Sequence, residues 1–355
     1  MSLVLNGTTG ITNLPSINSG QIGGRRNIVI NGEMKVAQRS TSVTGLGAAS
    51  GYFTLDRWNM AAGSTAGRFT MAQVADGPAG IANCLKLTTT TADTSIAAGE
   101  VLILQTKFEG QDVQQLKKGT ASAEQVTVSF YVKGNAAALY VCELFDYDNG
   151  RTITQSFAVT TAWNRIELTF AADTSDPLDD DTAASFAINI WLHAGSTYTG
   201  GTFAVNTWND NTNANRYAVA DRTSIFDATS RTFFITGIQM EIGTQATDFE
   251  SRSYSEELAL CQRYFCLPGR SVSFNFSAYA VNSFIDLAIS FSETMRTAPT
   301  IVTDTSGWTL ANCTYHSSAS STEQGFRLLV KSSAAATNAT VAGMSIGDIT
   351  ADAEL

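Results

Sequence analysis

Residues 126–132 read VTVSFYV, and this short run contains the pattern on which most of the chain is built. Apolar Val, Val, Phe and Val occupy the even positions and alternate with Thr, Ser and Tyr. A period of two predicts a β-strand with one face in a core. The same alternation recurs in 166–170, 186–192 and 238–242, and Gly-, Asn- and Asp-rich breaks separate the runs. The pattern therefore predicts strands joined by turns.

From about 27 to 250 these runs follow one another with no amphipathic helix between them. Many short alternating strands predict an antiparallel sandwich, and at this length a jelly roll is the natural choice. At 355 residues the chain is long enough for two domains, each with its own core. Residues 270–355 return to period two, which predicts a second, smaller β-domain. We therefore expect an all-β protein.

A short helix is predicted between the two β-regions. SYSE at 253–256 fits the capping box, in which each side chain satisfies an orphan backbone donor. Tyr254, Leu258 and Cys261 then form one apolar face, and Pro268 ends the run. The helix is marginal alone and must pack on something. Two interpretations remain open: it folds back on its own sandwich, or it forms a neck where three chains meet.

Several segments resemble a known family. NIVINGEMKVAQR (27–39), YFTLDRW (52–58) and TFFITGIQMEIGTQATDFESRSYSEELALCQRYF (232–265) resemble the opening and closing segments of a module found in bacteriophage tail fibres and related virion appendages. SETMRTAPTI (292–301) and the terminal ADAEL also resemble fibre tips. The resemblance covers roughly residues 27–265. It implies adhesion on a virus particle and names no chemistry.

The resemblance also implies how such a chain is organised. Fibres of this kind attach by their N-termini and are generally homotrimers, in which a ring of weak sites gains affinity through avidity. Residues 1–26 cannot close a core, so they are either a disordered tail or a peptide that docks onto a virion tail or adaptor protein, or onto sister chains. The predicted organisation is a virion-anchoring peptide (1–26), a carbohydrate-binding-like jelly roll (27–252), a connecting helix (253–267) and a C-terminal β tip (268–355).

Composition excludes several classes of function. Hydrophobic residues make up 44% and charged residues 15%, so the surface is neutral and rich in hydroxyl groups. A net charge of −10 without a Lys/Arg cluster argues against nucleic-acid binding. No apolar run is long enough for membrane insertion, and the start lacks the features of a signal peptide. We therefore expect synthesis in the bacterial cytoplasm and assembly into the virion tail.

The sequence gives little support for catalysis or for cofactor binding. No GxSxG, Walker A, HExxH or CxxC motif occurs, so we expect a non-enzyme without cofactors. The sequence does not exclude paired carboxylates for glycoside cleavage, because only their separation in space identifies them. Five cysteines and two histidines argue against a disulfide framework and a zinc site, and the cysteines are expected to be small buried hydrophobes.

An acidic stretch supplies weak calcium candidates. Five aspartates fall within residues 173–181, among them Asp173, Asp176 and Asp179. Calcium takes six to eight oxygen ligands from flexible loops. The spacing is not that of an EF-hand, and a solvated turn is the favoured interpretation.

Sugar recognition needs an aromatic face bordered by amide and hydroxyl groups. On the strand 186–192 the positions opposite the apolar residues are polar or aromatic, and similar residues follow on another strand and in a Gly/Asn-rich segment. The candidates are Asn189, Trp191, His193, Tyr131, Tyr198, Trp208 and Asn209. The alternative is that Trp191 is covered by a loop or by a neighbouring subunit.

The C-terminal region supplies a second set of candidates. Trp308, Tyr315 and His316 flank a run of Ser and Thr, a composition common to binding surfaces and to ordinary loops. With the N-terminus on the virion, this end is expected to reach the cell. The final residues alternate poorly and are expected to pair only in an oligomer.

The sequence thus predicts a non-catalytic tail fibre that binds host surface polysaccharide. The alternative is a structural tail-hub or capsid-decoration protein whose aromatic faces are buried between subunits. A depolymerase is the third class.

Overall fold

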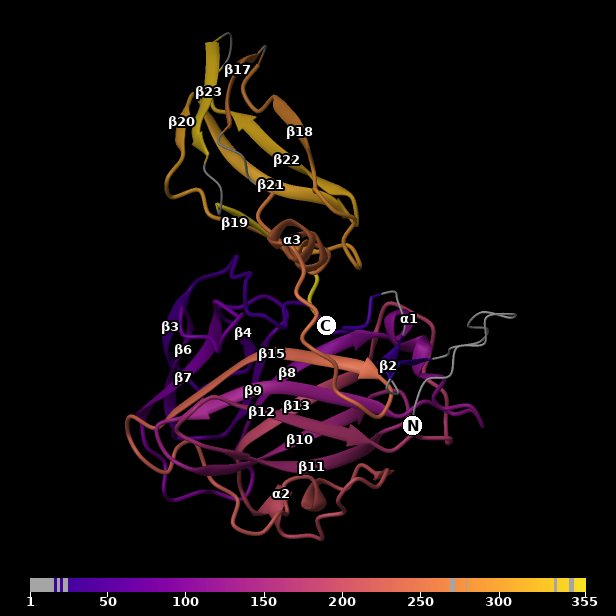
Figure 1. Cartoon of the computed structure of the whole chain (residues 1–355). Coiled ribbons are helices and arrows are strands. Elements are labelled where there is room, and N and C mark those ends of the chain that lie inside the picture. The colour runs from indigo at the N-terminus through magenta and orange to yellow at the C-terminus, as the bar shows by residue number, and fades with distance from the viewer. Residues whose placement is uncertain are drawn as a thin grey trace, which may run out of the picture. The chain divides into compact units, whose positions relative to one another are not determined.

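The computed structural model describes residues 16–17, 20–21, 25–268, 272–278, 280–334, 337–344 and 348–355. They fold into two compact units (Figure 1). Unit 1 contains the described residues up to Lys35 together with Thr41–Thr54 and Trp58–Ser251. Unit 2 contains Val36–Ser40, Leu55–Arg57 and the described residues from Arg252 onward. The second unit therefore includes two short segments from early in the sequence.

Unit 1 is a sandwich of two antiparallel sheets. The order of the seven-stranded sheet is β14 (Asn209–Asp210), β11 (Arg151–Val159), β10 (Ala138–Asp146), β13 (Ala184–Ala194), β8 (Val101–Glu109), β5 (Asn59–Gly63) and β4 (Gly51–Tyr52). The order of the six-stranded sheet is β12 (Asn164–Phe170), β9 (Val126–Gly134), β15 (Thr232–Ile242), β7 (Cys84–Thr91), β6 (Arg68–Val74) and β3 (Ser42–Leu46). Short elements lie outside the sheets: β1 (Ser16–Ile17), β2 (Gly20–Gln21), α1 (Gly110–Val113), η1 (Gln114–Leu116), α2 (Ser196–Thr199) and η2 (Asn213–Asn215).

The core of unit 1 lies between these two sheets. Phe130 on β9 meets Phe157 on β11 edge to face, with ring centroids 5.0 Å apart. Tyr140 on β10 meets Phe233 on β15 in the same way at 5.5 Å. Apolar positions of the predicted strands therefore point inward, as their alternation required. The all-β fold class, with an antiparallel jelly-roll sandwich before a short helix and a smaller β-unit, is confirmed; the trimer stays a prediction.

Unit 2 contains three small antiparallel sheets. Their strands are β16 (Phe265–Cys266), β24 (Ile349–Asp352) and β19 (Thr300–Thr303); β17 (Val272–Ala278), β23 (Thr337–Met344) and β20 (Thr309–Ala311); β18 (Phe284–Ser290), β22 (Gly325–Ser332) and β21 (Cys313–Thr322). Leu328, Val330 and Val341 lie at the centre of its main apolar cluster. The expectation that the final residues pair only in an oligomer is wrong, because β24 pairs with both β16 and β19 of the same chain.

The helix α3 (Tyr254–Gln262) begins with the predicted capping box: the Ser253 side chain accepts from Glu256 N–H, and the Glu256 side chain accepts from Ser253 N–H. Its buried residues are Glu257 and Cys261, whereas Tyr254 is 58% exposed, so the predicted apolar face is wrong at its first position. The helix ends at Gln262, before Pro268, because Phe265–Cys266 already pairs as β16.

Two further expectations concern the chain as a whole. All five cysteines are buried thiols, as predicted. The proposed anchoring peptide, residues 1–26, lies mostly outside the described residues. Among the described residues, no helix is long and apolar enough to cross a membrane.

Candidate binding site

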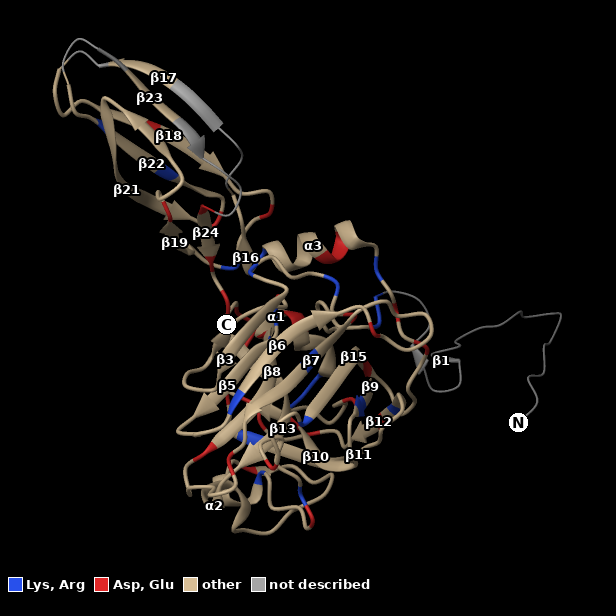
Figure 2. Cartoon of the chain, turned by 90° about the vertical axis from the view of Figure 1, so that its left-hand side faces the viewer, with Lys and Arg blue, Asp and Glu red and all other residues tan. Residues whose placement is uncertain are grey.

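Strand β13 carries the main sugar-binding candidates, and the structure buries it on both faces. Asn189, Trp191 and His193 are all 0% exposed. The prediction that Trp191 faces solvent is therefore wrong. The alternative, a covering loop, is correct: Tyr198 and Tyr217 pack on the indole with ring centroids 5.4 and 5.9 Å away. The segment that contains α2 lies beside the sheet that holds β10 and β13 (Figures 1 and 2).

A buried carboxylate organises this covered face. Glu143 on β10 accepts hydrogen bonds from Asn189 Nδ2 at 2.8 Å and from Trp191 Nε1 at 2.9 Å. The Arg216 guanidinium donates to both carboxylate oxygens at 2.7 Å and lies 4.8 Å from the Trp191 ring centroid. Burial would raise the pKa of Glu143, but Arg216 and the hydrogen bonds hold it below its ordinary value. These polar side chains therefore stabilise the covering segment, and all but the partly exposed Arg216 are buried.

The remaining candidates of unit 1 do not converge on Trp191. Tyr131 lies on β9, in the other sheet, and is half-buried. Trp208 is half-buried, and its indole donates to the Ala171 carbonyl at 2.8 Å. Asn209 pairs with Thr152 at the edge of the seven-stranded sheet. Only Tyr198 meets Trp191, and there it helps to cover the ring. The predicted carbohydrate platform is not assembled from these side chains.

Four aspartates of the acidic stretch are exposed, as the favoured interpretation of a solvated turn requires, and Asp173 is the buried one. Lys118 is 7% exposed, and its ammonium group lies 2.5 Å from Asp146 Oδ2 and 3.1 Å from Asp173 Oδ2. It also donates to the carbonyl oxygens of Ser175 and Asp176 at 3.1 and 2.8 Å. Four oxygen atoms thus surround the ammonium group of Lys118.

The contacts around Lys118 also show how the three calcium candidates are placed. Asp173 is also bound by Arg151 at 2.9 Å, so its carboxylate is already neutralised. Asp176 contributes its carbonyl to Lys118, and the backbone N–H of Asp179 donates to Asp148. The ammonium group of Lys118 therefore stands where the sequence suggested calcium.

In unit 2 the three candidates differ in exposure: Trp308 is buried, Tyr315 is half-buried and His316 is exposed. Trp308 is 8% exposed, packs edge to face on Tyr315, and donates its indole N–H to Asp348 at 2.8 Å. His316 is exposed and meets Phe284 with ring centroids 4.9 Å apart. Trp308 is therefore a core residue of this unit, and an exposed binding role for it is wrong.

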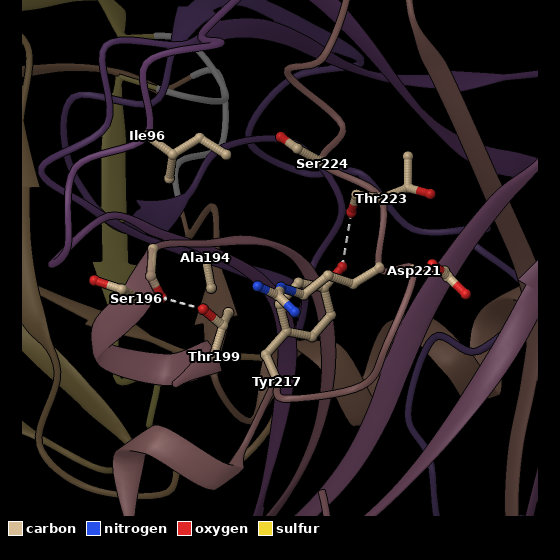
Figure 3. Close-up of a pocket in the computed structure, with 10 residues that line it drawn as sticks. Ile96, Ala194, Ser196, Thr199, Tyr217, Asp221, Thr223 and Ser224 are labelled. Carbon is tan, nitrogen blue, oxygen red and sulfur yellow. Dashed lines mark hydrogen bonds between the residues drawn. The ribbon is translucent and has the colours of Figure 1, made fainter. Parts of the chain in front are cut away.

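The structure presents a pocket that the sequence did not indicate. It encloses about 460 Å³ at the end of β13, beside α2. Figure 3 shows Ile96 and Ser196 on one side of it and Asp221 and Thr223 on the other. The other lining residues are Ala194, Gly195, Thr199, Tyr217, Arg222 and Ser224. Separate loops bring these residues together, so no single stretch of sequence contained a motif for the pocket.

The pocket offers chemically mixed walls. Ile96 is exposed and apolar, whereas Ser196, Thr199, Thr223 and Ser224 supply hydroxyl groups. Asp221 and Arg222 are exposed and contribute one charge of each sign. A neutral polar ligand with one apolar face fits such walls better than a strongly charged one.

No protein-family model matches the chain, and no curated protein matches it. Among solved structures, it is similar to a family 11 carbohydrate-binding module of a cellulosomal cellulase of Clostridium thermocellum, with 15% identity and a TM-score of 0.28 over 56% of this chain and 99% of that one. It is also similar to the N-terminal cellulose-binding domain of a Cellulomonas fimi β-1,4-glucanase, with 15% identity and a TM-score of 0.28 over 53% and 90%.

A further similarity is to the enzymatically active domain of tailspike protein 4 of Bacteriophage CBA120, with 10% identity and a TM-score of 0.30 over 61% of this chain and 21% of that one. TM-scores of this size carry no argument about function. The site is therefore interpreted from its own residues.

Proposed function

We propose that this chain is a non-catalytic virion appendage, a tail fibre, whose jelly-roll unit binds a host surface glycan in the pocket beside α2. The pocket itself is the observation that carries the binding part of the proposal. Its volume of about 460 Å³ lies within the usual range of roughly 300–1,000 Å³ for small-ligand sites.

A sugar ring matches the lining of the pocket. Its C–H face needs an apolar surface, which the exposed Ile96 supplies, and its edge needs donors and acceptors. Hydroxyl groups of Ser196 and Thr223, with the Asp221 carboxylate and the Arg222 guanidinium, can meet the sugar hydroxyls. Few charges lie along the strands, so recognition would depend on contact and not on steering (Figure 2).

Binding without cleavage follows from the same lining. Glycoside hydrolysis uses two carboxyl groups that flank the scissile bond. Asp221 is the single carboxylate among the ten residues that line the pocket. The pocket therefore lacks the pair that the sequence left open.

The tail-fibre part of the proposal rests on the sequence resemblance, and the structure joins its segments. Asn27 Nδ2 donates to the Ile238 carbonyl at 3.2 Å, and Met240 N–H donates to Asn27 Oδ1 at 3.2 Å. The Trp58 indole donates to the Asn31 carbonyl at 3.0 Å. The opening and closing segments thus pack together, which supports one module that begins near residue 27. A virion location, a homotrimer and attachment through the N-terminal peptide to a tail or adaptor protein belong to the same proposal.

A glycan array with the full chain tests the proposal. Asp221→Asn combined with Arg222→Gln changes two exposed side chains of the pocket. Glu167→Gln on β12 is the matched control, because its carboxylate is exposed and lies outside the pocket. We expect a selective signal that the pocket variant loses and the control keeps.

Two outcomes would contradict the proposal. Without any selective signal, the structural tail-hub or decoration role would be favoured. Release of reducing sugar from host polysaccharide would instead indicate a depolymerase.

A further inference from the structure

Three metal-binding side chains meet inside unit 1. Asp93 follows β7, Glu100 precedes β8, and His193 lies on β13. Their exposed fractions are 5%, 4% and 0%, and one ligand atom from each lies within 4.8 Å of the other two. Asp93 and Glu100 lie in the same connection between β7 and β8, and His193 joins them from a distant strand.

Asp93 is held in place through one of its oxygens. Oδ2 accepts from the Thr65 hydroxyl at 3.2 Å and from the backbone N–H groups of Ala66 and Gly67 at 3.0 and 3.2 Å. These three donors orient the carboxylate before any ligand arrives. The other oxygen, Oδ1, takes part in none of these bonds, and a side-chain hydrogen bond joins Asp93 to Glu100.

The His193 ring is oriented in a similar way. Nδ1 lies 2.7 Å from Ser224 Oγ, and Nε2 lies 3.0 Å from Glu100 Oε2. Nε2 thus points at the carboxylates, and a metal ion bound there would leave Nδ1–H to donate to the serine hydroxyl, the arrangement of a metal-bound histidine with an oriented ring.

The charge balance of this cluster differs from that of two other buried carboxylate sites. Glu143 is neutralised by Arg216, and Asp146 with Asp173 is neutralised by Lys118. Within the described part of the chain, neither Asp93 nor Glu100 forms an ion pair with a Lys or Arg. Two buried carboxylates at this separation repel one another unless a proton or a cation lies between them.

We propose that Asp93, Glu100 and His193 bind a divalent transition-metal ion, with Zn²⁺ as the representative ion. Zinc takes nitrogen and carboxylate ligands at about 2.0–2.2 Å in tetrahedral geometry, so two ligand atoms on one ion lie roughly 3.4 Å apart. His193 Nε2 and Glu100 Oε2 are already 3.0 Å apart, and the three ligand atoms lie within 4.8 Å of one another, so the side chains must close around the ion by up to about 1.4 Å. One imidazole with two carboxylates suits zinc better than calcium or magnesium, which take oxygen ligands.

This cation site does not depend on glycan binding. Ala194 and Ser224, which flank and contact His193, also line the pocket. A bound ion would fix β13 and the segments around Asp93 and Glu100 in one arrangement. Its expected effect is on stability, so it has a readout of its own.

The test uses the full chain after treatment with a chelator. Isothermal titration with Zn²⁺ is expected to show one high-affinity site per chain, with Ca²⁺ and Mg²⁺ far weaker. Glu100→Gln keeps the shape of the side chain and is expected to weaken Zn²⁺ binding by more than ~10-fold, the lower end of the loss that outer-shell changes alone cause. Glu167→Gln on the exposed face of β12 is the control and should bind as the wild type does.

Two further measurements make the result independent of folding defects. Co²⁺ added in place of Zn²⁺ should give visible absorption bands in the wild type that Glu100→Gln lacks. Without metal, Glu100→Gln should unfold at or above the wild-type temperature, because it removes one of two like charges, and Zn²⁺ should raise the unfolding temperature of the wild type alone. Absence of Zn²⁺ binding at micromolar concentration would overturn the proposal. So would equal Zn²⁺ affinity in the wild type and Glu100→Gln.

Discussion

Lys118 offers the sharpest test of how unit 1 is held together. Its ammonium group contacts two carboxylates, Asp146 and Asp173, and the carbonyl oxygens of Ser175 and Asp176. Lys118→Met keeps the aliphatic stem and removes the charge. Two buried carboxylates and two carbonyl oxygens are then left without a cation, and Arg151 alone remains as an ionic partner of Asp173.

The magnitude follows from this geometry. Removal of one partner of a buried ion pair costs about 3–5 kcal/mol, because the other charge stays buried and uncompensated. For a unit of this size, 1 kcal/mol corresponds to roughly 2–4 °C in the unfolding temperature. We therefore expect the transition of unit 1 to fall by on the order of 10 °C.

The assay is differential scanning calorimetry of the full chain at pH 7. Lys117→Met is the matched control, since the adjacent Lys117 has a 53% exposed side chain and pairs with Glu124 at the surface. A surface pair is worth about 0–1 kcal/mol, so the control should change little. Millimolar Ca²⁺ should restore part of the lost stability in Lys118→Met alone, because the vacated oxygens are the ligands that calcium prefers.

Two results would refute this reasoning. Equal effects of Lys118→Met and Lys117→Met would show that the buried ammonium group does not stabilise the fold. A large loss without any response to Ca²⁺ would show that the four oxygens do not form a cation site once the lysine is gone.

Four further predictions address other parts of the chain. Trp191→Ala should lower the free energy of unfolding by about 3–5 kcal/mol, measured by guanidinium denaturation, and leave glycan-array specificity unchanged in the folded fraction. Burial raises the pKa of Glu143, but Arg216 and the hydrogen bonds outweigh it and lower the pKa below its ordinary value of 4.5. The stabilisation is therefore present above pH 4.5 and lost as pH falls below it, and Glu143→Gln should weaken the dependence of the denaturation midpoint on pH in that acidic range. Burial raises the pKa of Asp56 from 3.8 to about 6. The stability of unit 2 is therefore highest below about pH 4 and falls as pH rises through 6. Asp56→Asn should remove this dependence of the unfolding temperature on pH, as measured by calorimetry. Gly237 has φ +61° and a Cβ there would lie 2.7 Å from Ile81, so Gly237→Ala should cost about 1–3 kcal/mol in the same denaturation assay.

Much of the architecture could be predicted from local pattern. The alternation in 126–132 places Phe130 inside because side chains of a strand point to opposite faces in turn. Ser253 and Glu256 specified the start of α3, since the capping box involves residues only three positions apart. These features depend on neighbours in sequence, which a single chain displays directly.

The predicted exposure of the sugar-binding candidates was wrong because exposure depends on contacts between residues that are not neighbours in sequence. Period-two alternation predicts that Trp191 lies opposite the core, and it does, but alternation does not say whether a loop covers that face. Tyr198 and Tyr217, separated from the strand by irregular segments, pack over the indole. Whether a large aromatic side chain is exposed is thus decided by the path of a loop that has no periodic pattern.

The sequence by itself determined that this protein is all-β, that a capped helix separates its two β-regions, and that its surface carries few charges. Those properties follow from spacing and composition, which need no knowledge of long-range contacts. Only the tertiary structure decided that Lys118 pairs with Asp146 and Asp173, that the pocket forms beside α2, and that Asp93, Glu100 and His193 meet. Each of these depends on residues brought together from separate segments, and short-range pattern does not encode which segments become neighbours in space.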